Sequence, residues 1–286
     1  MEIKKAIENY LRSVKVKNSF PTYTCYYSHL KSVYDFCISN NFVVVNDLKK
    51  EFYLKFIENS INKNVCNKTI NKRLRLFIKA LKYNKIYNAF EYESLKEKFK
   101  RFELVKHDDL KKIINFIYNM NDDRLTISNK VLVLLLIDTG IRINELLKIK
   151  INNIDLNKNK ILLTDTKTNR DRIVYFNLYT REVIIKLISY EFPTDFLLYN
   201  FRKNKNYTYD CVRYFFGFLE KKLKISHIHP HMFRHTFINN LIENGAPVFF
   251  VQQLAGHASI KTTQVYVHLN EKNLEECYKN YLKYDI

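Results

Sequence analysis

Glycine and proline are scarce in this chain, which has four of each among 286 residues. These two residue types shape tight turns and interrupt helices, so their scarcity leaves little material for a fold of many strands and hairpins. Apolar residues instead recur at spacings of three and four, for example in residues 3–11 and 65–83. The sequence therefore predicts a mainly α-helical protein.

Length and periodicity divide the chain into two predicted domains, since a domain usually has roughly 100–200 residues. Residues 1–95 show the pattern of four or five amphipathic helices, enough for one small bundle. Residues 96–106 are rich in charge and lack clean periodicity, so we interpret them as a basic linker, with a merely solvated surface segment as the alternative. Residues 107–286 form the second predicted domain.

In the second domain the apolar period changes from helical to alternating and back again. Helices are expected over residues 108–119, from residue 128 to Gly140, and over residues 142–147. The alternating part predicts a small three-stranded antiparallel sheet from residues 148–155, 160–164 and 172–176. The remaining expected helices span residues 180–190, 209–223, 230–243, 247–254, 259–269 and 274–282. The last of these is expected to dock either on its own domain or on a neighbouring protomer.

Charge narrows the class of partner. Lysine and arginine number 48 against 29 acidic residues, which gives a formal net charge of +19. Such a surplus favours a polyanionic partner, either a nucleic acid or an anionic membrane surface. The longest apolar run, residues 131–137, is far shorter than the roughly 20 residues that cross a bilayer, and the first residues show no signal-peptide core. We therefore expect no membrane insertion and a nucleic acid partner.

The predicted helix over residues 65–83 carries basic side chains between its apolar positions. These side chains are the candidates for DNA contact in the first domain: Lys68, Lys72, Arg73, Arg75 and Lys79.

The five cysteines are odd in number and irregularly spaced, and no two form a C-x-x-C pair. This pattern argues against a disulfide framework and against a zinc ribbon. We therefore expect a reducing, cytoplasmic setting.

The stretch Thr139-Gly140-Ile141-Arg142-Ile143-Asn144-Glu145 is the first with a pattern suited to chemistry. Arg142 follows a predicted tight turn at the start of a helix, where its guanidinium and the helix N-terminus could both face an anion. Glu145 lies three residues later and could orient the arginine. An ordinary surface pair of arginine and glutamate is the alternative.

A second stretch, His231-Met232-Phe233-Arg234-His235, follows Pro230, which suits the first position of a helix. Arg234 could hold a phosphate while His231 transfers a proton near neutral pH. Gly256 resembles a helix C-cap that leads into His257. The nearby histidines could instead bind a metal, but no H-E-x-x-H pattern or acidic third ligand is present, so we expect no metal and no other cofactor.

Two further residues are candidates for the site only because of their positions relative to these stretches. Tyr266 is one of 21 tyrosines, but it lies nine residues after His257. Lys167 lies in the polar turn between the second and third expected strands, where it could reach a bound groove as a proton donor. Arg170 and Arg172 on the same hairpin are the next candidates for that role.

These stretches together resemble the tyrosine recombinase, or phage integrase, family, and within it the compact Xer-like members. The family pattern has an arginine in a T-G-x-R-x-x-E-L box, a lysine on a β-hairpin, an H-x-x-R-H box, an L-x-G-H box and a tyrosine about nine residues later. Arg142 and Glu145, Lys167, His231 and Arg234, His257, and Tyr266 match these elements in order. The likeness is strongest over residues 107–270, and the segment before His231 is richer in histidine than the pattern requires.

The resemblance implies a role for each residue in DNA cleavage and rejoining. Tyr266 would be the nucleophile that forms a 3′-phosphotyrosine bond, with His231 as its base and Lys167 as the acid for the leaving 5′ oxygen. Arg142, Arg234 and His257 would stabilise charge on the phosphate, and Glu145 would support the site. No metal or nucleotide is needed in this scheme.

The resemblance also implies the partners and the overall arrangement. We expect a two-domain clamp on double-stranded DNA, with residues 1–95 as the core-binding domain, and a homotetramer on two synapsed duplexes. The target sequence, the biological role and the need for a helper protein stay open. Two alternatives are an enzyme like type IB topoisomerases, which relaxes DNA without exchanging partners, and a catalytically silent DNA-binding protein.

Overall fold

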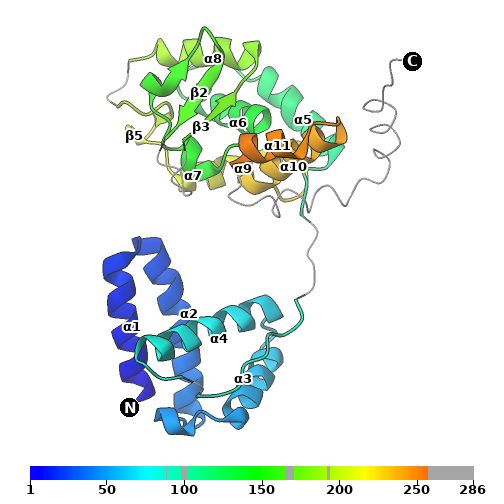
Figure 1. Cartoon of the computed structure of the whole chain (residues 1–286). Coiled ribbons are helices and arrows are strands. Elements are labelled where there is room, and N and C mark those ends of the chain that lie inside the picture. Colours follow the sequence, from blue (N-terminus) through cyan, green and yellow to red (C-terminus); the bar gives the residue numbers. More distant parts are fainter. Residues whose placement is uncertain (88, 98–101, 165–170, 192–193, 257–286) are drawn as a thin grey trace, which may run out of the picture. The chain divides into compact units, whose positions relative to one another are not determined.

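The chain divides into two compact units, Met1–Lys100 and Arg101–Ile286, which we describe separately. In the computed structural model (Figure 1), the described residues are 1–87, 89–97, 102–164, 171–191 and 194–256. Lys167, His257, Tyr266 and the predicted helices beyond residue 256 lie outside them. None of the described helices is long and apolar enough to cross a membrane.

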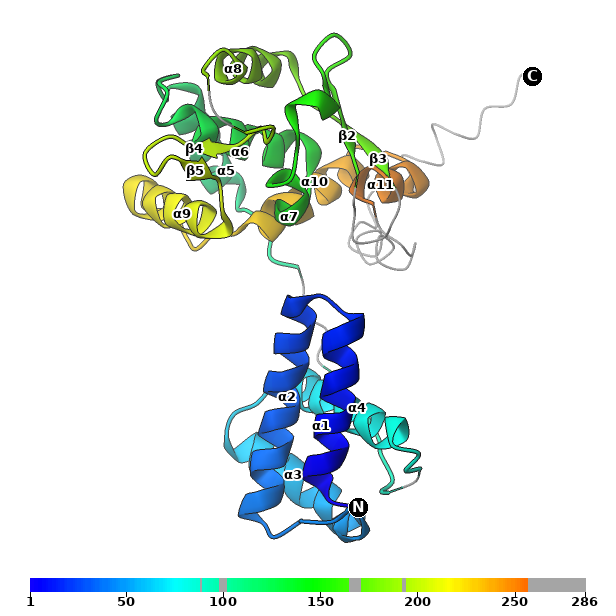
Figure 2. The same ribbon diagram turned by 90° about the vertical axis from the view of Figure 1, so that its left-hand side faces the viewer.

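The first unit is a bundle of helices. Its elements are α1 (Ile3–Lys17), α2 (Phe20–Ser39), the 3-10 turn η1 (Val45–Asp47), α3 (Lys50–Asn62) and α4 (Asn67–Tyr83). The helices α1 and α2 lie side by side, and α4 packs against both (Figures 1 and 2). This packing follows from an apolar stripe on α4, where Ile70, Leu74, Phe77 and Leu81 recur at helical spacing and are at most 2% exposed.

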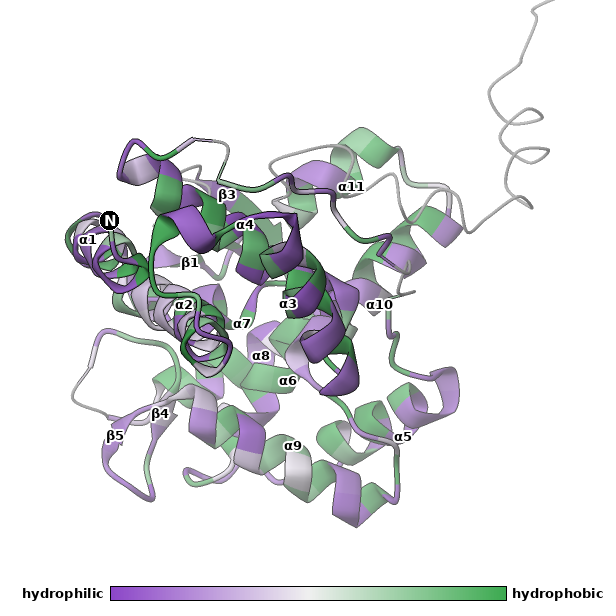
Figure 3. Ribbon diagram, turned by 90° about the horizontal axis from the view of Figure 1, so that it is seen from below, coloured by the Kyte–Doolittle hydropathy of each residue, from purple (hydrophilic) through white to green (hydrophobic). Residues whose placement is uncertain are grey.

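Seven helices are described in the second unit, between residues 102 and 256. They are α5 (His107–Tyr118), α6 (Ile127–Thr139), α7 (Ile143–Leu146), α8 (Leu178–Ile188), α9 (Tyr209–Leu223), α10 (Pro230–Glu243) and α11 (Val248–Ala255). The helix α6 is buried on nearly every side, because residues 131–136 are all apolar and at most 3% exposed; Figure 3 shows it largely in the hydrophobic colour. Both α8 and α10 pack against α6, which makes it the centre of this core.

A small antiparallel sheet in the order β1-β2-β3 lies beside these helices. It consists of β1 (Ile154–Asp155), β2 (Lys160–Leu163) and β3 (Arg172–Tyr175). Ile161 pairs with Val174 and Leu163 with Arg172, so Arg172 begins β3 at the end of the sheet nearest the hairpin. Since β3 packs against both α6 and α11, the sheet brings Arg172 to the end of α11. The mainly helical fold with a small three-stranded antiparallel sheet is as the sequence predicts.

Two details of the second unit differ from the prediction. The first expected strand, over residues 148–155, is reduced to β1, because residues 149–151 pair with another segment. The Ile151 N–H donates to the Asp195 carbonyl and the Leu197 N–H to the Ile149 carbonyl, each at 2.8 Å. The hairpin of β4 (Tyr199–Asn200) and β5 (Lys205–Asn206) was not predicted, since two-residue strands have no readable alternation.

The segment interpreted as a linker is bound at both of its described ends, each within its own unit. Glu97 accepts hydrogen bonds from Asn71 and Arg75 of α4, both at 2.9 Å. At the other end, Phe102 stacks on His235 of α10 with ring centroids 4.4 Å apart, and the Val105 N–H donates to the Thr236 hydroxyl at 2.9 Å. Each described end of this segment is therefore held to its own unit, the first by hydrogen bonds of the exposed Glu97 and the second by ring stacking and a backbone hydrogen bond.

Candidate active site

Arg142 is placed by the way in which α6 ends. Gly140 closes the helix in the left-handed conformation, with φ +55°, and the Thr139 hydroxyl accepts the Ile141 N–H at 3.1 Å. Arg142 then precedes α7, and Glu145 binds it twice, through the backbone N–H at 3.2 Å and through Nη1 at 2.8 Å. The Arg142 side chain is 22% exposed, so it lies at the edge of the core rather than inside it.

Arg234 approaches the same place from α10. Pro230 begins this helix, and Arg234 is buried on it at only 4% exposure, beside the buried core residue Phe233. Its guanidinium donates to the Gly140 carbonyl at 3.0 Å and to the Ala255 carbonyl. Arg142 donates to the Gly256 carbonyl at 2.6 Å. Both arginines therefore converge on the C-terminal end of α11, immediately before His257 in the sequence.

A third arginine completes this cluster. Arg172 of β3 binds the Glu145 carboxylate with two hydrogen bonds, of 3.0 and 2.6 Å, and its Nε donates to the Leu254 carbonyl at 3.3 Å. Burial by itself would raise the pKa of the Glu145 carboxyl, but the bonds and charges of Arg172 and Arg142 lower it below its ordinary value. Sequence reasoning considered Arg172 only as a substitute proton donor; its position at the start of a strand beside the hairpin was the one available signal.

His231 and His235 lie one turn apart on α10, with ring centroids separated by 6.5 Å. Partial desolvation lowers the pKa of His231, as do the positive charges of His229, Arg234 and Arg142. His231 is exposed to solvent, and the positive charges of Arg234 and Arg142 both act on its imidazole. His235, which is packed against Phe102, has its pKa lowered to about 4, chiefly by burial.

The described residues therefore bring together Arg142, Glu145, His231 and Arg234 of the predicted site. Lys167, His257 and Tyr266 lie outside the described residues, so their places in the site remain predictions. Among residues that the structure describes, no three histidine, cysteine or acidic side chains are gathered closely enough to hold a metal ion.

The predicted DNA-contacting residues of the first unit lie on α4, and they differ in their surroundings. Lys68, Lys72, Arg75 and Lys79 are exposed and recur at helical spacing on one face. Arg75 is paired with Glu97 at 2.9 Å, and the Lys72 ammonium lies 3.3 Å from the Cys25 sulfur.

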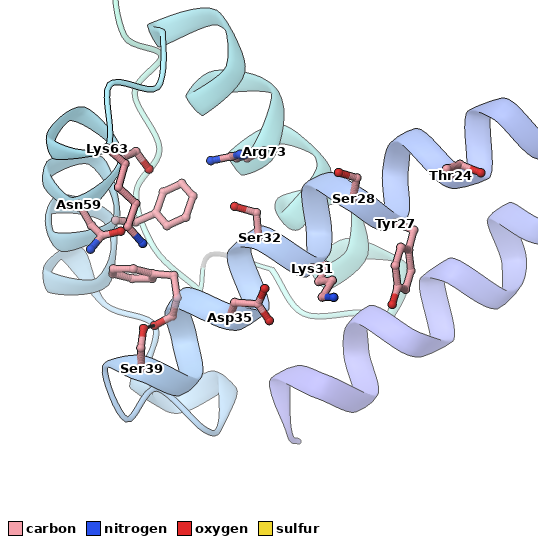
Figure 4. A pocket seen from close by; sticks show the side chains of 13 residues that line it. Thr24, Tyr27, Ser28, Lys31, Ser32, Asp35, Ser39, Asn59, Lys63 and Arg73 are labelled. Atoms are coloured by element: carbon pink, nitrogen blue, oxygen red, sulfur yellow. Dashed lines mark hydrogen bonds between the residues drawn. The ribbon is translucent and has the colours of Figure 1, made fainter.

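Arg73 instead lines a groove of about 540 Å³ within the first unit. Figure 4 shows it pointing into the hollow between α2 and α3, with Ser32 of α2 below it and Lys63, the residue after α3, opposite. The Arg73 Nε is buried and has no hydrogen-bond partner among the described residues. A buried donor of this kind is costly unless a ligand or water satisfies it.

Comparison with solved structures first gives the class of fold. The chain matches the Tn1549 transposon integrase in complex with a circular intermediate DNA at a TM-score of 0.76 and 17% identity, over 97% of this chain and 99% of that one. It matches a lambda integrase dimer bound to a core site at a TM-score of 0.72 and 14% identity, over 95% and 97% of the two chains. These likenesses show the fold of DNA integrases.

Comparison of sequences then gives the family. The model of the phage integrase family matches residues 103–273. A probable integrase/recombinase of Acholeplasma phage L2 is 33% identical over 216 residues, which are 75% of each chain. The tyrosine recombinase XerC of Staphylococcus epidermidis is 30% identical over an alignment 296 positions long, gaps included, that covers 96% of each chain. The chain belongs to the phage integrase family. It is a tyrosine recombinase, an enzyme of site-specific DNA recombination, as the sequence motifs predict, and the two alternative activities are not favoured.

Proposed function

We propose that this recombinase cleaves DNA by attack of Tyr266 on a phosphate held by Arg142 and Arg234. The observation that carries the proposal is the convergence of these two guanidiniums at the Ala255 and Gly256 carbonyls. His257 follows directly in the sequence and Tyr266 comes nine residues later. A phosphate bound beside this cluster would meet two fixed positive charges.

The proposed step conserves the energy of the bond that it breaks. The Tyr266 oxygen forms a bond to phosphorus while the bond from phosphorus to the 5′ oxygen breaks, which leaves a 3′-phosphotyrosine and a 5′-hydroxyl. His231 takes the phenol proton, and Lys167 gives a proton to the departing 5′ oxygen. A 5′-hydroxyl of the partner duplex then attacks the phosphotyrosine, which forms a new phosphodiester and releases Tyr266. Neither a metal nor a nucleotide is required in this scheme.

The lowered pKa of His231 suits the role of base. A base must be neutral when it takes the proton, and desolvation, together with the surrounding positive charges, favours the neutral form of this imidazole. Glu145 does not compete for this role, because its carboxylate is held by Arg142 and Arg172.

We further propose that the first unit binds the DNA backbone through the exposed face of α4 and the groove at Arg73. The four exposed cations of that face match a polyanion, and a phosphate oxygen in the groove would satisfy the Arg73 Nε. The solved neighbours bound to DNA, including XerH on a difH substrate at 21% identity and a TM-score of 0.64, agree with a duplex as the partner.

Exchange between two duplexes requires four strands to be cut. Since each protomer carries one Tyr266, we propose a homotetramer on synapsed DNA as the active assembly. A helper protein that activates cleavage is compatible with this assembly, and comparing purified protein with cell extract on the same substrate would detect one.

The test is a covalent adduct. Wild-type protein should form a denaturation-resistant complex on a duplex carrying the site recovered by selection from genomic DNA, and Tyr266→Phe should bind that duplex equally well without forming the complex. Recombinant products from two marked duplexes would distinguish strand exchange from relaxation by a topoisomerase. An adduct that persists in Tyr266→Phe would show that another residue is the nucleophile.

A further inference from the structure

We propose that Arg172 is a positioning residue for DNA cleavage, which holds Arg142 through Glu145 and holds the end of α11 through the Leu254 carbonyl. The inference rests on the proposed function, because it assigns Arg142 its role at the phosphate. It concerns a residue outside the set of catalytic residues that the sequence motifs predict.

The Glu145 carboxylate is fully used as a hydrogen-bond acceptor. Arg172 supplies two hydrogen bonds, and Arg142 supplies one from Nη1 and one from its backbone N–H. A carboxylate has about four acceptor positions, so this set leaves the group no freedom to rotate. The orientation of Arg142 is therefore fixed by a group that Arg172 itself holds in place.

At the end of α11, three successive carbonyls accept hydrogen bonds from three different arginines. Leu254 binds Arg172, Ala255 binds Arg234, and Gly256 binds Arg142. The last carbonyls of a helix lack partners within the helix and carry its partial negative charge, so cations stabilise them. This arginine clamp, formed by Arg142, Arg172 and Arg234, fixes the chain directly before His257.

Gly256 shows how closely Arg172 packs in the clamp. Its φ of +63° favours glycine, and a Cβ built there would lie 2.9 Å from Cδ, Nε and Cζ of Arg172. The glycine of the L-x-G-H box is therefore required by the arginine as well as by the end of the helix.

Burial and geometry separate Arg172 from a direct role. Its side chain is 9% exposed and its guanidinium is engaged with Glu145 and Leu254, so it acts through Arg142 rather than on DNA. An arginine is needed because a flat fork binds both carboxylate oxygens and a carbonyl at once, which the single ammonium of lysine does not reproduce. Its persistent charge also makes it unsuited to donate the proton that the mechanism requires.

The test compares cleavage of two forms of one substrate, the selected duplex with either a normal phosphodiester or an uncharged methylphosphonate at the scissile position. Removing the phosphate charge removes the need for Arg142. Arg172→Met should therefore slow adduct formation by about 10²–10³-fold on the phosphodiester, the usual effect of losing one preorganised donor, and by less than about tenfold on the methylphosphonate. Arg142→Met should show the same pattern, and the double variant should be little worse than either single one, because the two residues act as a unit.

Two further variants complete the design. Arg172→Lys keeps the charge beside Glu145 and should lie between wild type and Arg172→Met. Arg181→Met is the control, because Arg181 lies outside the clamp but also donates to a carbonyl, that of Leu156, and to a carboxylate, that of Glu182, each at 2.9 Å. This variant should match the wild-type rate on both substrates.

For each variant, the rate loss on the phosphodiester is compared with the rate loss on the methylphosphonate, so partial unfolding does not imitate the expected result. A smaller folded fraction would slow both substrates equally, and such an equal deficit would overturn the inference. A wild-type rate for Arg172→Met, or additive losses in the double variant, would also overturn it. Failure of wild type to form any adduct would instead contradict the proposed function.

Discussion

His231 and His235 occupy neighbouring turns of one helix but meet different surroundings. His235 is packed against Phe102, and its pKa of about 4 makes it a weak base near neutral pH. The pKa of His231 is lowered too, through desolvation and the charges of His229, Arg234 and Arg142, yet the residue is exposed to an approaching substrate. A general base works best when its pKa lies near the working pH, so His231 is the better base of the two.

We predict that the cleavage rate falls on the acid side with a midpoint below pH 6.5, the ordinary value for histidine. The base must be neutral, and a lowered pKa keeps it neutral down to a lower pH, so the rate should reach its plateau at a lower pH than an ordinary histidine would give. The measurement is single-turnover adduct formation at a series of pH values. His231→Ala should lose about 10²–10⁴-fold in rate and lose this acid limb, while His235→Phe, which preserves the stacking on Phe102, should keep it. An unchanged acid limb in His231→Ala would mean that another group is the base.

At the scale of elements, the sequence predicts best where a local rule decides. The start of α10 at Pro230 and the ends of α6 and α11 at Gly140 and Gly256 follow from backbone preferences of single residues, and the structure has all three. The apolar run of α6 likewise identifies a core helix before any contact is known.

Elements and contacts that depend on distant partners were not predictable in this way. Residues 149–151 pair with residues 195–197 rather than extending β1, and no local pattern reveals that choice. The same holds for Lys130, which is 2% exposed within α6 and donates to the Met120 carbonyl and to Asp122. In the site, the motif indicates Glu145 beside Arg142, but the pairing with Arg172 joins residues 27 apart. Sequence periodicity indicates which face of a helix is buried, but it does not identify the distant side chain that packs against that face.

The end of α6 provides a test at this scale. Gly140 has φ +55°, and a Cβ there would lie 2.4 Å from Cδ1 and 3.0 Å from Cβ of Phe237 on α10. We predict that Gly140→Ala lowers the free energy of unfolding by about 2–4 kcal/mol, from about 1–2 kcal/mol of left-handed strain and a similar cost of overpacking. Hydrogen exchange of α6 and α10 amides would measure this loss without interference from the first unit.

Gly245 supplies the matched control, since its φ is +79° but no heavy atom lies within 4 Å of its built Cβ. Gly245→Ala should cost only the strain of about 1–2 kcal/mol. Gly140→Ala should in addition slow cleavage, because the Gly140 carbonyl accepts a hydrogen bond from Arg234. Equal losses of stability in the two variants would show that Phe237 moves aside at no cost.

At the scale of the whole molecule, charge is spread over both units and is only partly neutralised by internal pairs. The net charge is +19, and in the first unit four of the cations on α4 are exposed along one face. Arg73 differs from these four, since its Nε is buried in the groove without a hydrogen-bond partner among the described residues. Desolvation lowers the pKa of the Arg73 guanidinium. A charge-assisted hydrogen bond to a phosphate is strongest in such a desolvated place.

We therefore predict that affinity for duplex DNA falls steeply with salt, because each neutralised phosphate adds about 0.9 to the slope of log K against log salt concentration. If about six to ten phosphates are contacted, the slope should lie between about −5 and −9.

Arg73→Met should weaken binding on specific and random duplexes alike and reduce the slope by about 1. The control is Lys55→Met on α3, which removes an exposed cation already paired with Glu51 at 2.6 Å and should leave the slope unchanged. Fluorescence anisotropy at a series of salt concentrations measures both values. A slope near zero for wild type would show that the positive charge is not a DNA-binding surface, and equal slopes for wild type and Arg73→Met would place the phosphate contacts outside the groove.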